Sequence, residues 1–280
     1  MSGADEPTGF LYPFIEAEER DTGSLLTDLA ASARGKIDQS RRVQAETLGS
    51  CADELDRAAT AIAERIAAGG RLFTFGNGGS STDAEMTADL FCHPPATQAD
   101  GWPTPQPAGP PSAGDDETIP TAAAPSAADD QDRGWPAPPP VGLATAAGDP
   151  PPPRASRPRP MAASCLVADR AVLTALANDV GFELVFSRQL IAHARPGDVA
   201  IGFSTSGGSA NVLRAFAEAR RRQLVTVGFA GYDGGEMAAS DDVDHCLVVR
   251  SDSVHRIQEA QDALVFDLWA RVQRCSVGRT

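Results

Sequence analysis

The sequence predicts an α/β fold built on a parallel sheet. Short apolar runs of strand length, such as 71–75 and 199–203, alternate with segments whose apolar residues recur at helical spacing. Strands separated by helices form βαβ units, in which helices cover both faces of the sheet. Two glycine- and serine-rich turns, at 76–81 and 204–209, each join such a strand to such a helix.

The first elements predicted are helical. Apolar residues from Leu25 to Ala68 recur at spacings compatible with one apolar stripe, on two long helices or on one helix broken near Gly49. Gly69-Gly70 ends this pattern, as glycine often ends a helix. A buried strand is expected at 71–75, and a helix follows the first glycine turn.

The second half predicts the remaining elements of the sheet. The expected strands are 163–167, 199–203, 224–229 and 245–249, and the expected helices are 171–176, 182–194, a helix from Ser209, and 256–273.

Between these halves the composition changes abruptly. Of the 22 prolines in the chain, 19 lie between His93 and Pro160, where they preclude a continuous helix. We therefore expect three parts: an irregular acidic segment 1–23, one domain formed by 24–92 and 160–275, and a disordered insert 93–159.

Composition excludes several classes of protein. The net charge of −14 argues against direct nucleic-acid binding, which needs clustered basic residues. The five cysteines are odd in number, widely spaced and without a CxxC pair, so neither a disulfide framework nor a cysteine zinc site is indicated. No signal sequence or membrane span is recognised. A cytoplasmic protein without a membrane or nucleic-acid partner is expected.

The turn 204–209 has the chemistry of a phosphate site. The hydroxyls of Ser204, Thr205, Ser206 and Ser209 lie where a helix begins, and unpaired N–H groups and the helix dipole favour an anion there. A serine-rich loop with Ser209 as N-cap is the alternative. Both glycine turns fall at the carboxyl edge of the expected sheet, where ligands bind in open α/β folds, and this favours a phosphate ligand.

Four motifs in order resemble the sedoheptulose 7-phosphate isomerase (phosphoheptose isomerase) family of the sugar isomerase, or SIS, superfamily. They are Gly76-Asn77-Gly78-Gly79-Ser80, 173–181, 204–212 and Arg256-Ile257-Gln258-Glu259. The resemblance implies a SIS-type, flavodoxin-like five-stranded parallel sheet, to which the helices predicted within 25–68 form an N-terminal helical extension. It also implies a cytoplasmic homotetramer with sites at subunit interfaces, which converts sedoheptulose 7-phosphate into a heptose phosphate.

Carried over by position, the resemblance assigns the sugar phosphate contacts. They are Asn77, Gly78, Gly79, Ser80, Asn178, Asp179, Ser204, Thr205, Ser206, Ser209 and Gln258.

The resemblance fails at the metal and proton-transfer positions. The family has His and Glu where this chain has Met86 and Leu90, and a second His where it has Phe266. Of that set only Gln258 is retained. Met, Leu and Phe supply neither a base nor a zinc ligand, so we expect no metal or other cofactor and an impaired or absent isomerase activity.

Other residues are weaker candidates for acid or base. Glu85 and Asp89 form a carboxylate pair about 100° around the helix from the lost positions, where a solvated helix face is the simpler interpretation. His255 is expected near the substrate end of the last strand, as a polar loop residue or a ligand contact.

Three functional hypotheses follow. The chain is a phosphosugar-binding sensor, regulator or assembly partner that has lost the isomerase chemistry. Alternatively, it is an isomerase with relocated catalytic groups, or one working in a mixed oligomer with an intact paralogue. The third hypothesis is an oligomeric scaffold with the insert as its recruiting arm, against which the phosphate-site hydroxyls count.

Overall fold

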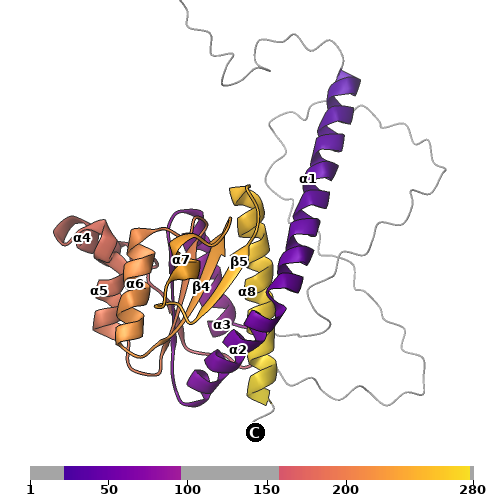
Figure 1. Ribbon diagram of the computed structural model, residues 1–280. Helices are drawn as coiled ribbons and strands as arrows, with labels where there is room; N and C mark the ends of the chain where they lie inside the picture. Colours follow the sequence, from indigo (N-terminus) through magenta and orange to yellow (C-terminus); the bar gives the residue numbers. More distant parts are fainter. Residues whose placement is uncertain (1–21, 96–157, 278–280) are drawn as a thin grey trace, which may run out of the picture. The chain divides into compact units, whose positions relative to one another are not determined.

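The computed structural model describes residues 22–95 and 158–277, which include a five-stranded sheet flanked by helices (Figure 1). Nearly all of the predicted irregular segment 1–23 and of the predicted insert 93–159 lies outside these residues. The division into domains therefore stays a prediction.

The sheet confirms the predicted fold class. Its strands are β1 (Leu72–Gly76), β2 (Ala163–Cys165), β3 (Val199–Ser204), β4 (Val225–Gly231) and β5 (His245–Val249). They are all parallel, in the order β2-β1-β3-β4-β5, which is the flavodoxin-like order. β1 pairs with β2 from Leu72 opposite Ala163, so residues on both sides of 96–157 share one sheet.

The helices also lie close to their predicted places. They are α1 (Thr22–Ser50), α2 (Ala52–Ala67), α3 (Gly79–Cys92), α4 (Arg170–Asp179), a short 3-10 helix (Phe182–Leu184), α5 (Val185–His193), α6 (Ala210–Arg221), α7 (Gly235–Ala239) and α8 (Val254–Val277). The first pair separates at Cys51, two residues beyond Gly49. The short α7 was not predicted.

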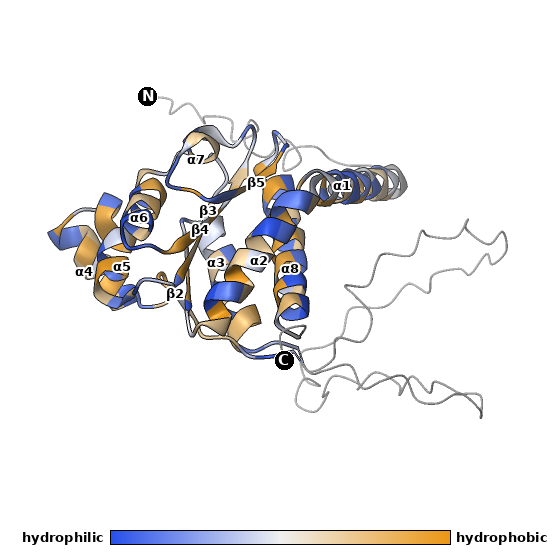
Figure 2. Cartoon of the chain, turned by 60° about the horizontal axis from the view of Figure 1, so that its bottom comes forward, coloured by the Kyte–Doolittle hydropathy of each residue, from blue (hydrophilic) through white to orange (hydrophobic). Residues whose placement is uncertain are grey.

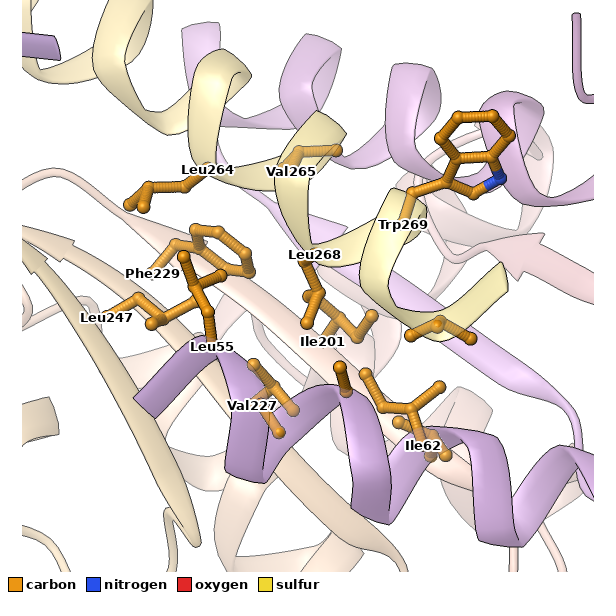
Figure 3. Packing of buried hydrophobic residues seen from close by; sticks show 14 of the residues in the cluster. Leu55, Ile62, Ile201, Val227, Phe229, Leu247, Leu264, Val265, Leu268 and Trp269 are labelled. Carbon is orange, nitrogen blue, oxygen red and sulfur yellow. The ribbon is translucent and has the colours of Figure 1, made fainter. Parts of the chain in front are cut away.

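Alternate strand residues face two separate cores, as the twofold repeat of a strand requires. On one face, α2, α3 and α8 cover residues such as Ile201 and Phe229, and Figure 3 shows Leu55, Leu264 and Leu268 packed there. On the other face, α5 and α6 cover residues such as Phe75.

The predicted apolar stripe of the first helices is only partly buried. Val43 and Leu48 pack against the core, whereas Leu26, Leu29 and Ile37 are 65%, 56% and 50% exposed. Figure 2 shows the reason, since α1 lies beside α8 and reaches away from the sheet. Helical periodicity therefore predicted the helix here but not its burial. None of the described helices is long and apolar enough to cross a membrane.

Candidate functional site

The two glycine turns are neighbours at the carboxyl edge of the sheet. β1 and β3 pair directly, with Gly76 opposite Phe203, and both chains turn into helices immediately after these residues. The turn 76–80 leads into α3 and the turn 204–209, called the serine loop below, leads into α6. First-turn N–H groups of two helices thus lie at the same edge.

A pair of asparagines joins the two turns. The side-chain amides of Asn77 and Asn211 each donate a hydrogen bond to the other's oxygen, both at 2.8 Å. Asn211 is the second residue of α6 and is only 3% exposed. Because the bonds are reciprocal, they fix the distance between the turn 76–80 and the first turn of α6.

The hydroxyls of the serine loop converge. The Oγ of Ser204 lies 3.0 Å from that of Ser209 and 3.5 Å from that of Ser206. Ser209 occupies the N-cap position of α6, but its side chain makes no capping hydrogen bond, which leaves its hydroxyl in the cluster. Ser204 is buried and Ser206 is exposed, so the cluster extends from the core to the surface.

A third turn, between β4 and α7, is hydrogen-bonded to the backbone of the serine loop. Gly231 donates its N–H to the Thr205 carbonyl at 3.0 Å, and Met237 donates to the Gly207 carbonyl at 2.8 Å. Gly207 has a φ of 65°, and a Cβ there would lie 2.0 Å from the Gly234 carbonyl oxygen. The sequence predicted a glycine-rich turn at 231–235, but nothing in its composition connected it with the serine loop.

Gln258 reaches the other glycine turn. A Cβ on Gly79 would lie 2.0 Å from the Gln258 Nε2, so the amide occupies the space that a side chain at 79 would need. Gly78 has a φ of 55° and is exposed, while Ser80 is buried below it. Of the predicted contacts, the structure thus brings together residues 77–80, the serine loop and Gln258.

Asn178 and Asp179 do not join this group. They are exposed at the C-terminal end of α4, where Asn178 donates to the Asp179 carboxylate at 2.9 Å. Within residues 22–95 and 158–277, no hydrogen bond connects either side chain to a glycine turn. Their role as substrate contacts stays a prediction.

The weaker acid and base candidates are all exposed. Glu85 and Asp89 lie on the solvent side of α3, and the Asp89 carboxylate is 2.8 Å from the His93 Nδ1. His255 is in the first turn of α8 and is also exposed. This geometry matches the solvated helix face that the sequence offered as the simpler interpretation of the carboxylates.

The residues at the family's metal positions do not fit a zinc ion. Met86 is 39% exposed, Leu90 packs against the core, and the Phe266 ring lies 5.3 Å from that of Trp269. Zinc sites use nitrogen, oxygen or thiolate donors, and these three side chains offer none. No group of three or more His, Cys, Asp or Glu suited to a metal occurs among the residues the structure describes.

Sequence reasoning missed one buried acid near the site. Asp83 lies one turn into α3 and is 6% exposed, and its Oδ2 has no hydrogen-bond partner. Burial, assisted by the charge of Asp262, raises the pKa of Asp83 to about 7. Its spacing of four residues from Gly79 was the available signal, because it puts Asp83 on the helix face that meets Gln258.

Known proteins resemble this chain in sequence. Residues 37–91 match the family model described as the SIS domain. The phosphoheptose isomerase of Paramagnetospirillum magneticum is 52% identical over 101 residues, which cover 36% of this chain and 52% of that protein. That of Sulfurimonas denitrificans is 50% identical over 103 residues, with the same coverage of both chains. These matches confirm the resemblance to the phosphoheptose isomerases of the SIS superfamily. It spans about half the length of the curated relatives it matches.

Solved structures of phosphoheptose isomerases share the fold. Phosphoheptose isomerase from Neisseria gonorrhoeae superposes with a TM-score of 0.62 at 24% identity, covering 88% of this chain and 99% of that one. The enzyme from Francisella tularensis gives a TM-score of 0.60 at 20% identity, covering 88% and 98%. At these identities the likeness concerns the fold alone.

Proposed function

We propose that this SIS-domain chain binds a sugar phosphate at its serine loop and lacks the metal-assisted isomerisation of its family. The observation that carries the proposal is the contrast between two sets of positions. The hydroxyl cluster of Ser204, Ser206 and Ser209 is assembled beside a helix N-terminus, a favourable site for a phosphate. The metal positions hold Met86 and Leu90 instead of ligands.

The relatives guide the choice of sugar. They are named phosphoheptose isomerases, so a seven-carbon ketose phosphate such as sedoheptulose 7-phosphate is the first ligand to test. A tetrameric assembly and a cytoplasmic location accompany this proposal as implications of the family resemblance.

Two measurements test the proposal. We expect sedoheptulose 7-phosphate to raise the melting temperature of the full chain, because a ligand at 100 times its Kd stabilises by about 2.7 kcal/mol. Replacing Ser206 and Ser209 together by Ala should abolish this rise. Ser50→Ala serves as the control, since that hydroxyl contacts the Thr47 carbonyl and the adjacent Cys51 Sγ and no residue of the serine loop. A rise that survives in the double variant would place the phosphate elsewhere.

Metal analysis and an NMR assay of the sugar phosphate test the second part. We expect no stoichiometric zinc and no metal-dependent turnover. Bound zinc with formation of the aldose would instead favour an active isomerase, acting alone or with an intact paralogue. Absence of any sugar phosphate binding would leave the scaffold hypothesis.

A further inference from the structure

The starting observation is the unpaired carboxyl of Asp83. Its Oδ2 is buried without a hydrogen-bond partner, and an ionised carboxylate in that environment is costly. The raised pKa of Asp83, about 7, expresses that cost. Near neutral pH this residue is thus protonated in a large fraction of molecules and can donate a proton.

Helix register places Asp83 opposite Asp262. α3 follows β1 and α8 follows β5, so both helices begin at the carboxyl edge of the parallel sheet and pack together in the same direction. Gly79 on α3 meets Gln258 on α8. One turn farther along each helix come Asp83 and Asp262, and the charge of Asp262 is one cause of the raised pKa of Asp83.

The surroundings make the two carboxyls unequal. Asp83 is buried, whereas Asp262 is exposed on α8. The pKa of Asp262 is also raised, first by burial of part of its side chain and then by the charge of Glu259. Glu259 is itself held by Arg256 and by the Ser40 hydroxyl of α1. The pair thus offers a buried proton donor and a more accessible acceptor.

The next turns of the two helices are apolar. Met86 and Leu90 follow on α3, and Phe266 follows on α8, where Leu90 and Phe266 pack against the core. The carboxyl pair therefore lies between the glycine turn and an apolar interface. This places it one helical turn beyond Gly79, in the glycine turn that the Asn77–Asn211 pair joins to the first turn of α6.

We propose that Asp83 and Asp262 are an acid–base pair that exchanges protons at C1 and C2 of a ketose phosphate held by the serine loop, without a metal. This inference rests on the proposed binding of a sugar phosphate. It names catalytic groups that differ from the exposed candidates Glu85, Asp89 and His255.

The proton balance closes within the pair. Ionised Asp262 takes a proton from C1 of the open-chain ketose while protonated Asp83 gives its proton to the C2 carbonyl oxygen, which forms a 1,2-enediol. Asp262 then returns its proton to C2, and the C1 hydroxyl gives its proton to Asp83 as the C1 aldehyde forms. Both carboxyls end in their starting states, so no cofactor or co-reactant is consumed.

The test uses deuterium exchange, which detects proton abstraction even when net conversion is small. The full chain, treated with a chelator, is incubated with sedoheptulose 7-phosphate in D2O, and loss of the C1 proton signal is followed by NMR. We expect enzyme-dependent exchange that falls by about 10²- to 10⁴-fold in Asp83→Asn and in Asp262→Asn, the range typical of a lost general acid or base. The exchange rate of the unaltered chain should also depend on pH around 7.

The control is Asp267→Asn, which removes an α8 carboxylate that pairs with Arg271 and should leave exchange unchanged. Ligand-induced thermal stabilisation should persist in both test variants. Binding without exchange in the unaltered chain would overturn the acid–base pair and leave the proposed binding function intact. Exchange that persists in Asp83→Asn, or that stops on chelation, would also overturn it, and absence of binding would remove both proposals.

Discussion

The serine loop and the α3–α8 interface have opposite character. The loop is polar and closely bonded, with hydroxyls converging between two helix N-termini. Beyond Asp83 and Asp262, the interface is lined by Met86, Leu90 and Phe266, which supply no zinc ligand. Under the proposed function, recognition and chemistry are separable in this fold, because the hydroxyls lie before α6 whereas the metal positions lie on α3 and α8.

The largest effect is expected from restoring the missing ligands. The triple variant Met86→His, Leu90→Glu and Phe266→His, with Gln258 retained, should bind about one zinc per chain, because it supplies nitrogen and oxygen donors on two packed helices. Zinc is measured by elemental analysis after gel filtration. The single variant Met86→His is the control and should retain none. If the unaltered chain bound as much zinc as the triple variant, the α3–α8 interface would not lack metal-binding capacity, and the contrast with the serine loop would be wrong.

The next effect concerns the rigidity of the serine loop. Gly207→Ala should weaken sugar phosphate binding at least tenfold and destabilise the fold by about 1–3 kcal/mol, since a side chain at φ 65° is strained and would meet the Gly234 carbonyl. Urea unfolding measures the loss of stability, and ligand-induced thermal shifts measure the loss of sugar phosphate binding. Gly208→Ala is the matched control, because its Cβ would meet nothing nearer than the Ser206 Oγ at 3.9 Å. Similar losses in both variants would argue against a specific role for the Gly207 backbone.

A smaller effect is expected at the link between the two turns. Asn211→Ala removes both amide hydrogen bonds and leaves the Asn77 amide without that partner, which costs about 1–3 kcal/mol. The double-mutant cycle with Asn77→Ala, measured by urea unfolding, should give a coupling energy of at least about 0.5 kcal/mol. Additive losses would mean that the pair does not act as a unit.

The sequence predicted the fold well because the signals were local. Strand runs, helical spacing and the two glycine turns each depend on a few consecutive residues, and all five strands follow from them. The serine loop was predicted for the same reason. Burial was harder to predict. Leu26 and Leu29 have helical spacing but lie exposed, because periodicity indicates an apolar face without indicating what covers it.

The parts of the site that escaped prediction depend on distant segments. Asn77 and Asn211 are 134 positions apart, and the turn behind Gly207 comes from the following strand. Asp83 stands in a helix with other acids, and its burial in the packed structure distinguishes it from exposed Glu85 and Asp89. Spacing places such residues on a helix face, but tertiary contacts decide which of them is buried.

The smallest effect expected is a change in the pH dependence of stability. Asp83 has a pKa near 4 when unfolded and about 7 when folded, so the folded state binds its proton more tightly. The stability that this proton provides is complete below about pH 4 and is lost as pH rises to about 7, after which the loss levels off. The melting temperature of the unaltered chain should therefore fall by roughly 5–10 °C more between pH 5 and pH 8 than that of Asp83→Asn. The repulsion among charges in a chain of net charge −14 affects the unaltered chain and the variant alike, so it cancels in the comparison. Asp267→Asn should show the same dependence of melting temperature on pH as the unaltered chain. Equal slopes in the unaltered chain and Asp83→Asn would mean that the Asp83 carboxyl ionises normally, and the α3–α8 interface would then lack its proton donor.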